Sequence, residues 1–94
     1  MATGTFEDFA AAARAEGYDE ALERSWPADT FLDTHTHDFA VKLVLIRGEM
    51  VFTVGDDARR LRPGDGFTLE RQVPHSERYG PEGATYWVAR RNTA

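Results

Sequence analysis

Residues 34–48 read THTHDFAVKLVLIRG, and this stretch places a pair of histidines directly before a long apolar run. The run is interrupted only by Lys42 and is typical of a central β-strand covered on both faces. His35 and His37 are one residue apart, and on an extended backbone that spacing sends both imidazoles to the same side. The chain's only other histidine, His75, follows a proline at the start of another strand-like segment.

The chain after Tyr18 has the pattern of an all-β domain. Short segments rich in β-branched and aromatic residues alternate with turn signals, at the spacing expected of a sandwich or barrel. Eight such strands in a chain this small can share one interior only as a compact double sheet or a closed barrel. The expected strands are Glu20–Trp26, Thr30–Thr36, Val41–Arg47, Met50–Val54, Ala58–Arg62, Phe67–Glu70, His75–Tyr79 and Thr85–Arg90.

A short helix is expected before the strands. Thr5 is followed three residues later by the acidic Asp8, which is close to a capping box, and Phe6 and Phe9 begin an apolar stripe at helical spacing. Gly17 stands where a helix commonly ends. We therefore expect residues 1–17 to form a helical segment that packs on the outside of a β domain formed by residues 18–94.

Length, charge and composition exclude several classes of protein. Ninety-four residues suit one domain, and 11 basic against 16 acidic residues give a net charge of −5, which argues against binding to nucleic acid. There is no cysteine for a disulfide or a thiolate ligand. No run is long and apolar enough for a membrane span, and no signal peptide is visible. We expect a cytoplasmic protein.

The spacing around the histidine pair resembles the first sequence motif of the cupins. That motif is a glycine, five residues, H-x-H, three or four residues, a glutamate, six residues and a glycine. Here His35, His37 and Gly48 match it, whereas Asp29 stands for the first glycine and Val41 for the glutamate.

The second cupin motif is matched more loosely. Gly64 and His75 stand at the expected interval and have the expected type, whereas Glu70, Gln72 and Tyr79 replace the motif's proline, second glycine and asparagine. The resemblance extends over roughly residues 20–90. It implies a small antiparallel jelly-roll β-barrel, here with one short N-terminal α-helix.

The resemblance also implies a metal site inside the mouth of the barrel. His35, His37 and His75 keep the ligand roles of the family, but Val41 cannot replace the glutamate, and Lys42 beside it points to the other face. The expected site is therefore one divalent ion, Fe, Zn, Ni or Mn, held by three imidazoles and open to water or substrate.

Several functions remain open at this point. Three-histidine cupin sites resemble those of dioxygenases, so the leading expectation is a small-molecule metalloenzyme with dioxygenase-like or isomerase-like chemistry. The first alternative is a non-enzymatic ligand-binding cupin, akin to the sensor domains of bacterial transcription regulators. Since no helix-turn-helix segment follows in the sequence, such a sensor would act through a partner. A metal-free structural pseudo-cupin is the last alternative. We also expect a homodimer, as in many cupins.

Overall fold

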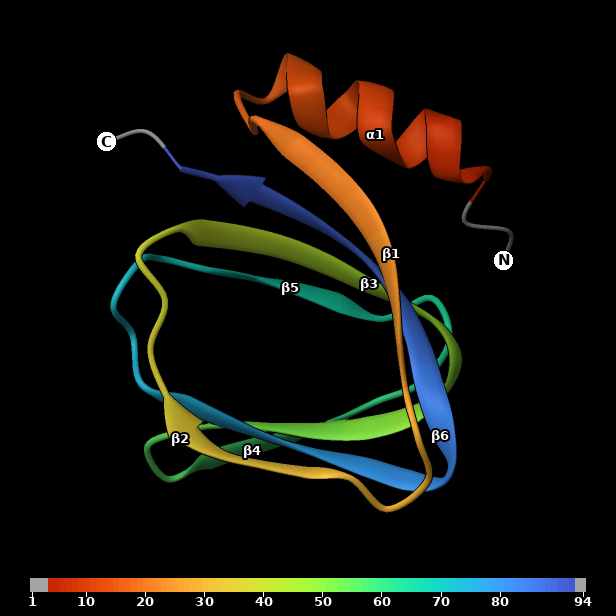
Figure 1. Ribbon diagram of the computed structural model, residues 1–94, viewed down its shortest axis with the longest axis vertical. Helices are drawn as coiled ribbons and strands as arrows, with labels where there is room; N and C mark the ends of the chain where they lie inside the picture. The colour runs from red at the N-terminus through yellow and green to blue at the C-terminus, as the bar shows by residue number, and fades with distance from the viewer. Residues whose placement is uncertain (1–3, 93–94) are drawn as a thin grey trace.

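The computed structural model describes residues 4–92 and shows one helix on the outside of an antiparallel β-barrel (Figure 1). The first three and last two residues of the expected segments 1–17 and 18–94 lie outside this range, and the division between the two segments remains a prediction. The elements are α1 (Phe6–Ala15), β1 (Glu20–Trp26), β2 (Phe31–His35), β3 (Ala40–Val54), β4 (Asp57–Leu61), β5 (Gly66–Leu69) and β6 (His75–Arg91).

Two long strands, β3 and β6, connect two layers of the barrel. The first half of β3 pairs with the second half of β6, with β5 and β1 on their outer sides. The second half of β3 pairs with the first half of β6, with β4 and β2 on their outer sides. Figure 1 shows the two layers facing each other. This is the expected jelly-roll fold.

The number of strands differs from the sequence-based expectation. Two pairs of expected strands each form one continuous strand, which leaves six strands within residues 4–92. These pairs are Val41–Arg47 with Met50–Val54, and His75–Tyr79 with Thr85–Arg90. Gly48 does not close a turn: it has φ +82° and lies between two register shifts of the β3–β6 ladder. The chain bends there and continues in the other layer, as a bulge allows.

The interior is built by residues that alternate along β3 and β6. Val41, Leu43 and Leu45 are buried, whereas Lys42 between them points outward and forms an ion pair with Glu16 near the end of α1 at 2.8 Å. Alternation of this kind is what a strand with one face toward a core requires. The same alternation brings the even-numbered residues from Tyr86 to Arg90 to the interior face of β6.

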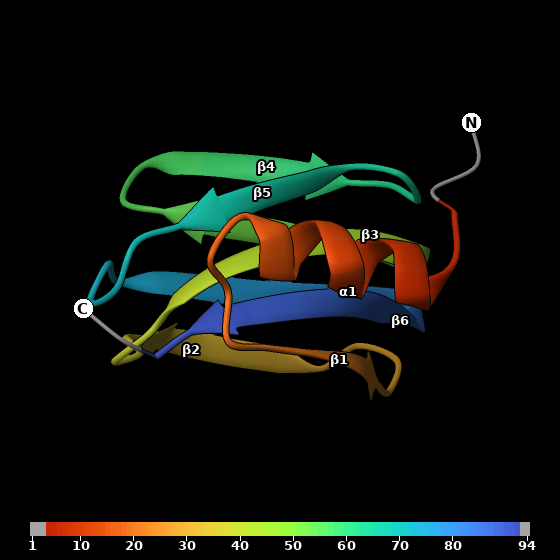
Figure 2. The ribbon, with the colours of Figure 1, turned by 90° about the horizontal axis from the view of Figure 1, so that it is seen from above.

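The helix covers the outer face of the layer that contains β1 and the end of β6. Thr5 and Asp8 form the expected capping box, and the helix ends at Ala15, two residues before Gly17. Phe6 packs edge-on against Trp87, with ring centroids 5.8 Å apart. Trp87 is thus buried beneath the helix. Figure 2 shows α1 lying over this layer of the barrel.

Candidate metal centre

The three histidines come together at one end of the barrel interior. His35 is the last residue of β2 and stands opposite His75, the first residue of β6, in the β2–β6 register. His37 lies in the connection to β3, beyond the end of the expected strand Thr30–Thr36, and its imidazole still faces the other two. One ligand atom from each ring lies within 4.8 Å of the others, a grouping that can hold a metal ion.

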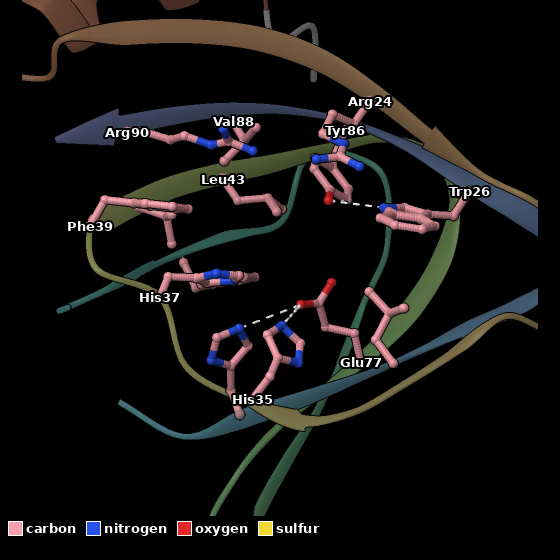
Figure 3. A pocket seen from close by; sticks show the side chains of 14 residues that line it. Arg24, Trp26, His35, His37, Phe39, Leu43, Glu77, Tyr86, Val88 and Arg90 are labelled. Atoms are coloured by element: carbon pink, nitrogen blue, oxygen red, sulfur yellow. Dashed lines mark hydrogen bonds and ion pairs between the residues drawn. The ribbon is translucent and has the colours of Figure 1, made fainter. Parts of the chain in front are cut away.

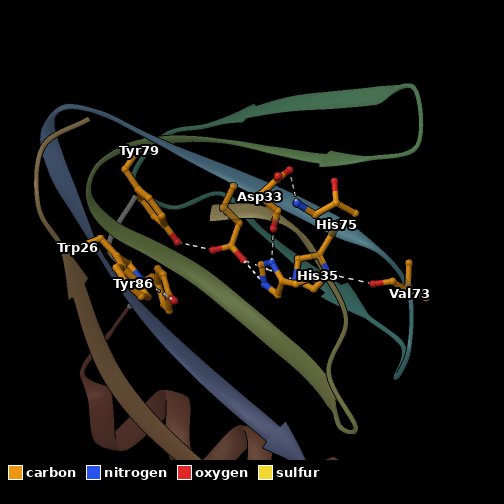
Figure 4. A network of polar contacts seen from close by, with 9 residues as sticks. Trp26, Asp33, His35, Val73, His75, Tyr79 and Tyr86 are labelled. Carbon is orange, nitrogen blue, oxygen red and sulfur yellow. Dashed lines mark hydrogen bonds and ion pairs between the residues drawn. The ribbon is translucent and has the colours of Figure 1, made fainter. Parts of the chain in front are cut away.

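Hydrogen bonds to the backbone fix the orientation of two of the rings. His35 Nδ1–H donates to the carbonyl oxygen of Asp33 at 2.6 Å, and His75 Nδ1–H donates to that of Val73 at 2.9 Å (Figure 4). A carbonyl oxygen only accepts, so the proton of each neutral ring is on Nδ1 and the lone pair is on Nε2. Backbone carbonyls commonly orient metal-binding histidines in this way.

A carboxylate that sequence reasoning missed completes the cluster. Glu77 is 8% exposed, and its Oε2 lies 3.5 Å from Nε2 of both His35 and His75 (Figure 3). These three atoms are all acceptors, so a metal ion between them would stabilise their approach. Two ligands about 2.1 Å from one tetrahedral ion lie about 3.4 Å apart, which matches these separations.

A tyrosine holds Glu77 in place. The Tyr79 hydroxyl donates to Oε1 of Glu77, which leaves Oε2 free to face the histidines (Figure 4). Burial is the main cause that raises the pKa of Tyr79 far above its ordinary value, with smaller effects from Tyr86 and Glu77. The hydroxyl therefore remains a donor at every physiological pH. The sequence contained a signal for this arrangement, because His75, Glu77 and Tyr79 alternate along one face of a strand.

His37 is held in the neutral form that a metal ligand requires. Burial, followed by the neighbouring His75 and His35 and by Arg90 and Arg24, lowers the pKa of His37 to about 4. Its ring stacks on Phe39 with centroids 4.7 Å apart. Above pH 5, His37 therefore presents an imidazole lone pair without first having to lose a proton.

A cavity of about 200 Å³ opens over the cluster (Figure 3). Its walls are mainly apolar or aromatic and include Phe39, close to the histidine pair in the sequence. Val41 also lines the wall, so the residue at the position of the motif's glutamate packs against the cavity and offers no ligand atom. Trp26 and Tyr86 line the cavity too, joined by a hydrogen bond from Trp26 Nε1 to the Tyr86 hydroxyl at 3.0 Å.

Comparison with solved structures shows that this chain has the fold of the cupins. An RmlC-like cupin from Shewanella frigidimarina superposes with a TM-score of 0.71 at 18% identity, over 82% of this chain and 68% of that one. An oxalate decarboxylase from Bacillus subtilis gives 0.68 at 20% identity, over 76% of this chain and 20% of that one. Identities this low support the fold alone.

A third solved structure is more similar in sequence to this chain. The DMSP lyase DddQ from Ruegeria pomeroyi is 28% identical, with a TM-score of 0.70, over 79% of this chain. This chain spans only 40% of the length of that lyase. No curated protein matches the sequence.

The family model narrows the class. Residues 17–92 match the model of the AraC-like ligand-binding domain, and the chain belongs to this family. The match begins directly after α1 and includes all four residues of the cluster. Among residues 4–92, no helix is long and apolar enough to cross a membrane.

Proposed function

We propose that this protein binds one divalent metal ion through His35, His37, His75 and Glu77, and that it acts on a small molecule at this ion. The observation that carries the proposal is the convergence of Glu77 Oε2 with the Nε2 atoms of His35 and His75 at 3.5 Å, inside a cavity. Glu77 takes the part of the carboxylate for which the sequence offers only Val41.

The donor set suits the metals expected from the sequence. Three imidazoles and one carboxylate are appropriate for Fe, Zn, Ni or Mn, and an ion bound on the wall of a cavity keeps positions for water or substrate. Such an ion would supply Lewis-acid chemistry toward a bound small molecule. We propose dioxygenase-like or isomerase-like chemistry, with the apolar walls excluding water from the bound molecule.

A metal titration tests this proposal. Purified protein stripped with a chelator should bind one equivalent of Zn²⁺, Ni²⁺, Mn²⁺ or Fe²⁺, measured by calorimetry and elemental analysis. His75→Ala should abolish binding, and Glu77→Gln should weaken it about 100-fold or more, because loss of a ligand costs at least as much as loss of an outer-shell partner.

The matched control is Glu70→Gln, since Glu70 is exposed and outside the cluster. It should bind metal as the original chain does. Full metal affinity in the Glu77→Gln variant would contradict the role of Glu77 as a ligand, and absence of metal from the original chain under all four conditions would overturn the proposed function.

A non-enzymatic ligand-binding domain is the second candidate, and the family match over residues 17–92 favours it. Both candidates bind a small molecule in the same cavity. Compounds that raise the melting temperature of the metal-loaded protein are identified first. Each is then incubated with the protein for hours, with and without oxygen, and product formation is measured. Binding without turnover supports the sensor, and turnover supports the enzyme.

We also propose a homodimer in the cytoplasm. Val44 and Ile46 on the outward face of β3 are only partly buried, which supports a further apolar cover by a second copy. Light scattering of the purified protein measures the oligomeric state directly.

A further inference from the structure

Two arginines face the candidate metal centre from the opposite wall of the cavity. Arg24 on β1 and Arg90 on β6 both line it, and Figure 3 shows their side chains across the cavity from His35 and Glu77. Both side chains project from strands of the layer beneath α1, whereas His35, His75 and Glu77 come from the other layer. The cavity therefore has a metal-binding wall and a cationic wall.

Neither arginine has a carboxylate partner within residues 4–92. Each guanidinium lies over an aromatic ring, Arg24 over Trp26 at 5.0 Å and Arg90 over Phe39 at 4.8 Å. Stacking of this kind leaves the N–H groups at the edge of the guanidinium available to a ligand. The side-chain Nε of Arg90 is buried without a hydrogen-bond partner.

The carboxylate that stands opposite Arg90 in the sheet is engaged elsewhere. Glu20 stands opposite Arg90 in the β1–β6 register, but its Oε2 accepts from Asn92 Nδ2 at 2.9 Å. On the other side, Arg90 stands opposite the uncharged Val41 of β3. Val41 therefore places an apolar side chain where a carboxylate could have neutralised Arg90.

We propose that Arg24 and Arg90 form an anion subsite that binds the carboxylate of a small organic acid. This inference rests on the proposed function, because the other end of the acid would reach the metal ion. A guanidinium matches a carboxylate through two parallel hydrogen bonds, and it does so best where water is scarce. The positive charge of the two guanidiniums and a divalent ion would also exceed the single negative charge of Glu77. The cavity therefore favours an anion, although the chain as a whole is acidic.

The size of the cavity limits the ligand further. At about 200 Å³ it is smaller than the pockets of roughly 300–1,000 Å³ that hold drug-sized ligands. Acids of a few carbon atoms, with a second oxygen donor for the metal, are the class that fits.

The test is calorimetric binding of malonate, succinate and lactate to the zinc-loaded protein at low ionic strength. At least one acid should bind, and malonamide, which lacks the charge, should bind at least about tenfold more weakly than malonate. Arg24→Gln and Arg90→Gln should each weaken binding of the acid about tenfold or more, the loss expected for a hydrogen bond to a charged group.

Arg91→Gln is the matched control. Arg91 follows Arg90 in β6, also has a buried Nε without a partner, and lies over Tyr18 rather than along the cavity. Its variant should bind the acids within about twofold of the original chain. Thermal unfolding checks that each variant folds, and Arg90→Lys, which keeps the charge but loses the planar fork, replaces Arg90→Gln if the latter does not fold.

The outcomes separate this inference from the proposed function. If the chain binds metal, three results would each overturn the anion subsite alone. They are unchanged affinity for the acids in both arginine variants, equal affinity for malonamide and malonate, and binding of none of the acids. If the original chain binds no metal, the proposed function fails. The subsite is then judged by the same substitutions and acids on metal-free protein, where loss of affinity in the Arg90 and Arg24 variants still supports it.

Discussion

At the scale of single residues, the backbone carbonyls decide what the histidines can do. Asp33 and Val73 each accept from the Nδ1–H of the histidine two residues later, so the lone pairs on Nε2 of His35 and His75 are aimed before any ion arrives. A ligand set that is already oriented loses less conformational entropy on binding than one that must be assembled. The third ring, His37, is prepared differently, by an environment that disfavours its charged form.

The lowered pKa of His37 predicts how the metal-free protein responds to acid. The pKa of His37 is about 4 in the folded chain against an ordinary value of 6.5, which the unfolded chain retains, so the unfolded chain binds more protons between these two values. Stability should therefore fall as the pH drops from about 6.5 toward 4. His37→Gln removes this contribution. In urea unfolding with a chelator present, its free energy of unfolding should depend less on pH across that window.

The comparison is made between the two proteins at each pH, because carboxylates elsewhere titrate in both. At about pH 7.5 the imidazole of His37 is neutral in both the folded and the unfolded chain, so the free energies of unfolding at this pH serve as the reference. Equal pH dependence in the variant and the original chain would show that His37 is not the group responsible.

The residues of the site could be predicted from the sequence only in part. The three histidines follow from their spacing, and the structure places them together. Glu77 was not predicted, because the family motif directs attention to the position of Val41 and because a glutamate in a strand is ordinarily solvated. Glu77 is buried because it lies on the interior face of β6, between Leu32 of β2 and Phe52 of β3. No local sequence pattern specifies these long-range pairings.

At the scale of elements, the bends in β3 and β6 are what turn a flat ladder into a barrel. Gly48 of β3 stands beside Ala84 of β6, and a Cβ atom on Gly48 would collide with the Gly83 carbonyl oxygen and come within 2.9 Å of the Ala84 Cα. Turn-forming residues in a sequence indicate where the chain changes direction, but a bulge and a hairpin use the same residues. The expectation of eight strands was wrong for this reason.

Gly48→Ala should therefore destabilise the fold strongly. A positive φ costs roughly 1–2 kcal/mol for a residue with a side chain, and the backbone collision adds to it, so we expect a loss of about 3 kcal/mol or more in urea unfolding. Gly55→Ala is the control. Gly55 also has a positive φ, +59°, but a Cβ there meets nothing within 4 Å.

The control variant should lose only the conformational part, about 1–2 kcal/mol. If both variants lose the same stability, the close approach of β3 to β6 at Gly48 is not what requires glycine.

At the scale of the whole molecule, metal binding and folding should be coupled. An ion that binds only the folded chain stabilises it by about 2.7 kcal/mol when its free concentration is 100 times Kd. For a chain of this size that corresponds to a rise in Tm of roughly 10 °C or more. Calorimetric scans with the metal that binds best, followed by excess chelator, measure the rise and its reversal.

His75→Ala provides the comparison, since it removes a buried ligand. Its Tm should not respond to the same metal, whatever its starting value. A rise in Tm of the same size in this variant would mean that the stabilising ion binds elsewhere on the chain.

The pairing of β2 with β6 has a kinetic consequence. His35 stands at the end of β2, a strand of five residues that pairs with β6 alone, whereas His75 and Glu77 belong to β6 itself. A bound ion therefore fastens the edge of the barrel to its longest strand. We expect the ion to leave only when that edge opens, so the rate of metal dissociation and the rate of hydrogen exchange at the β2 amides should rise and fall together.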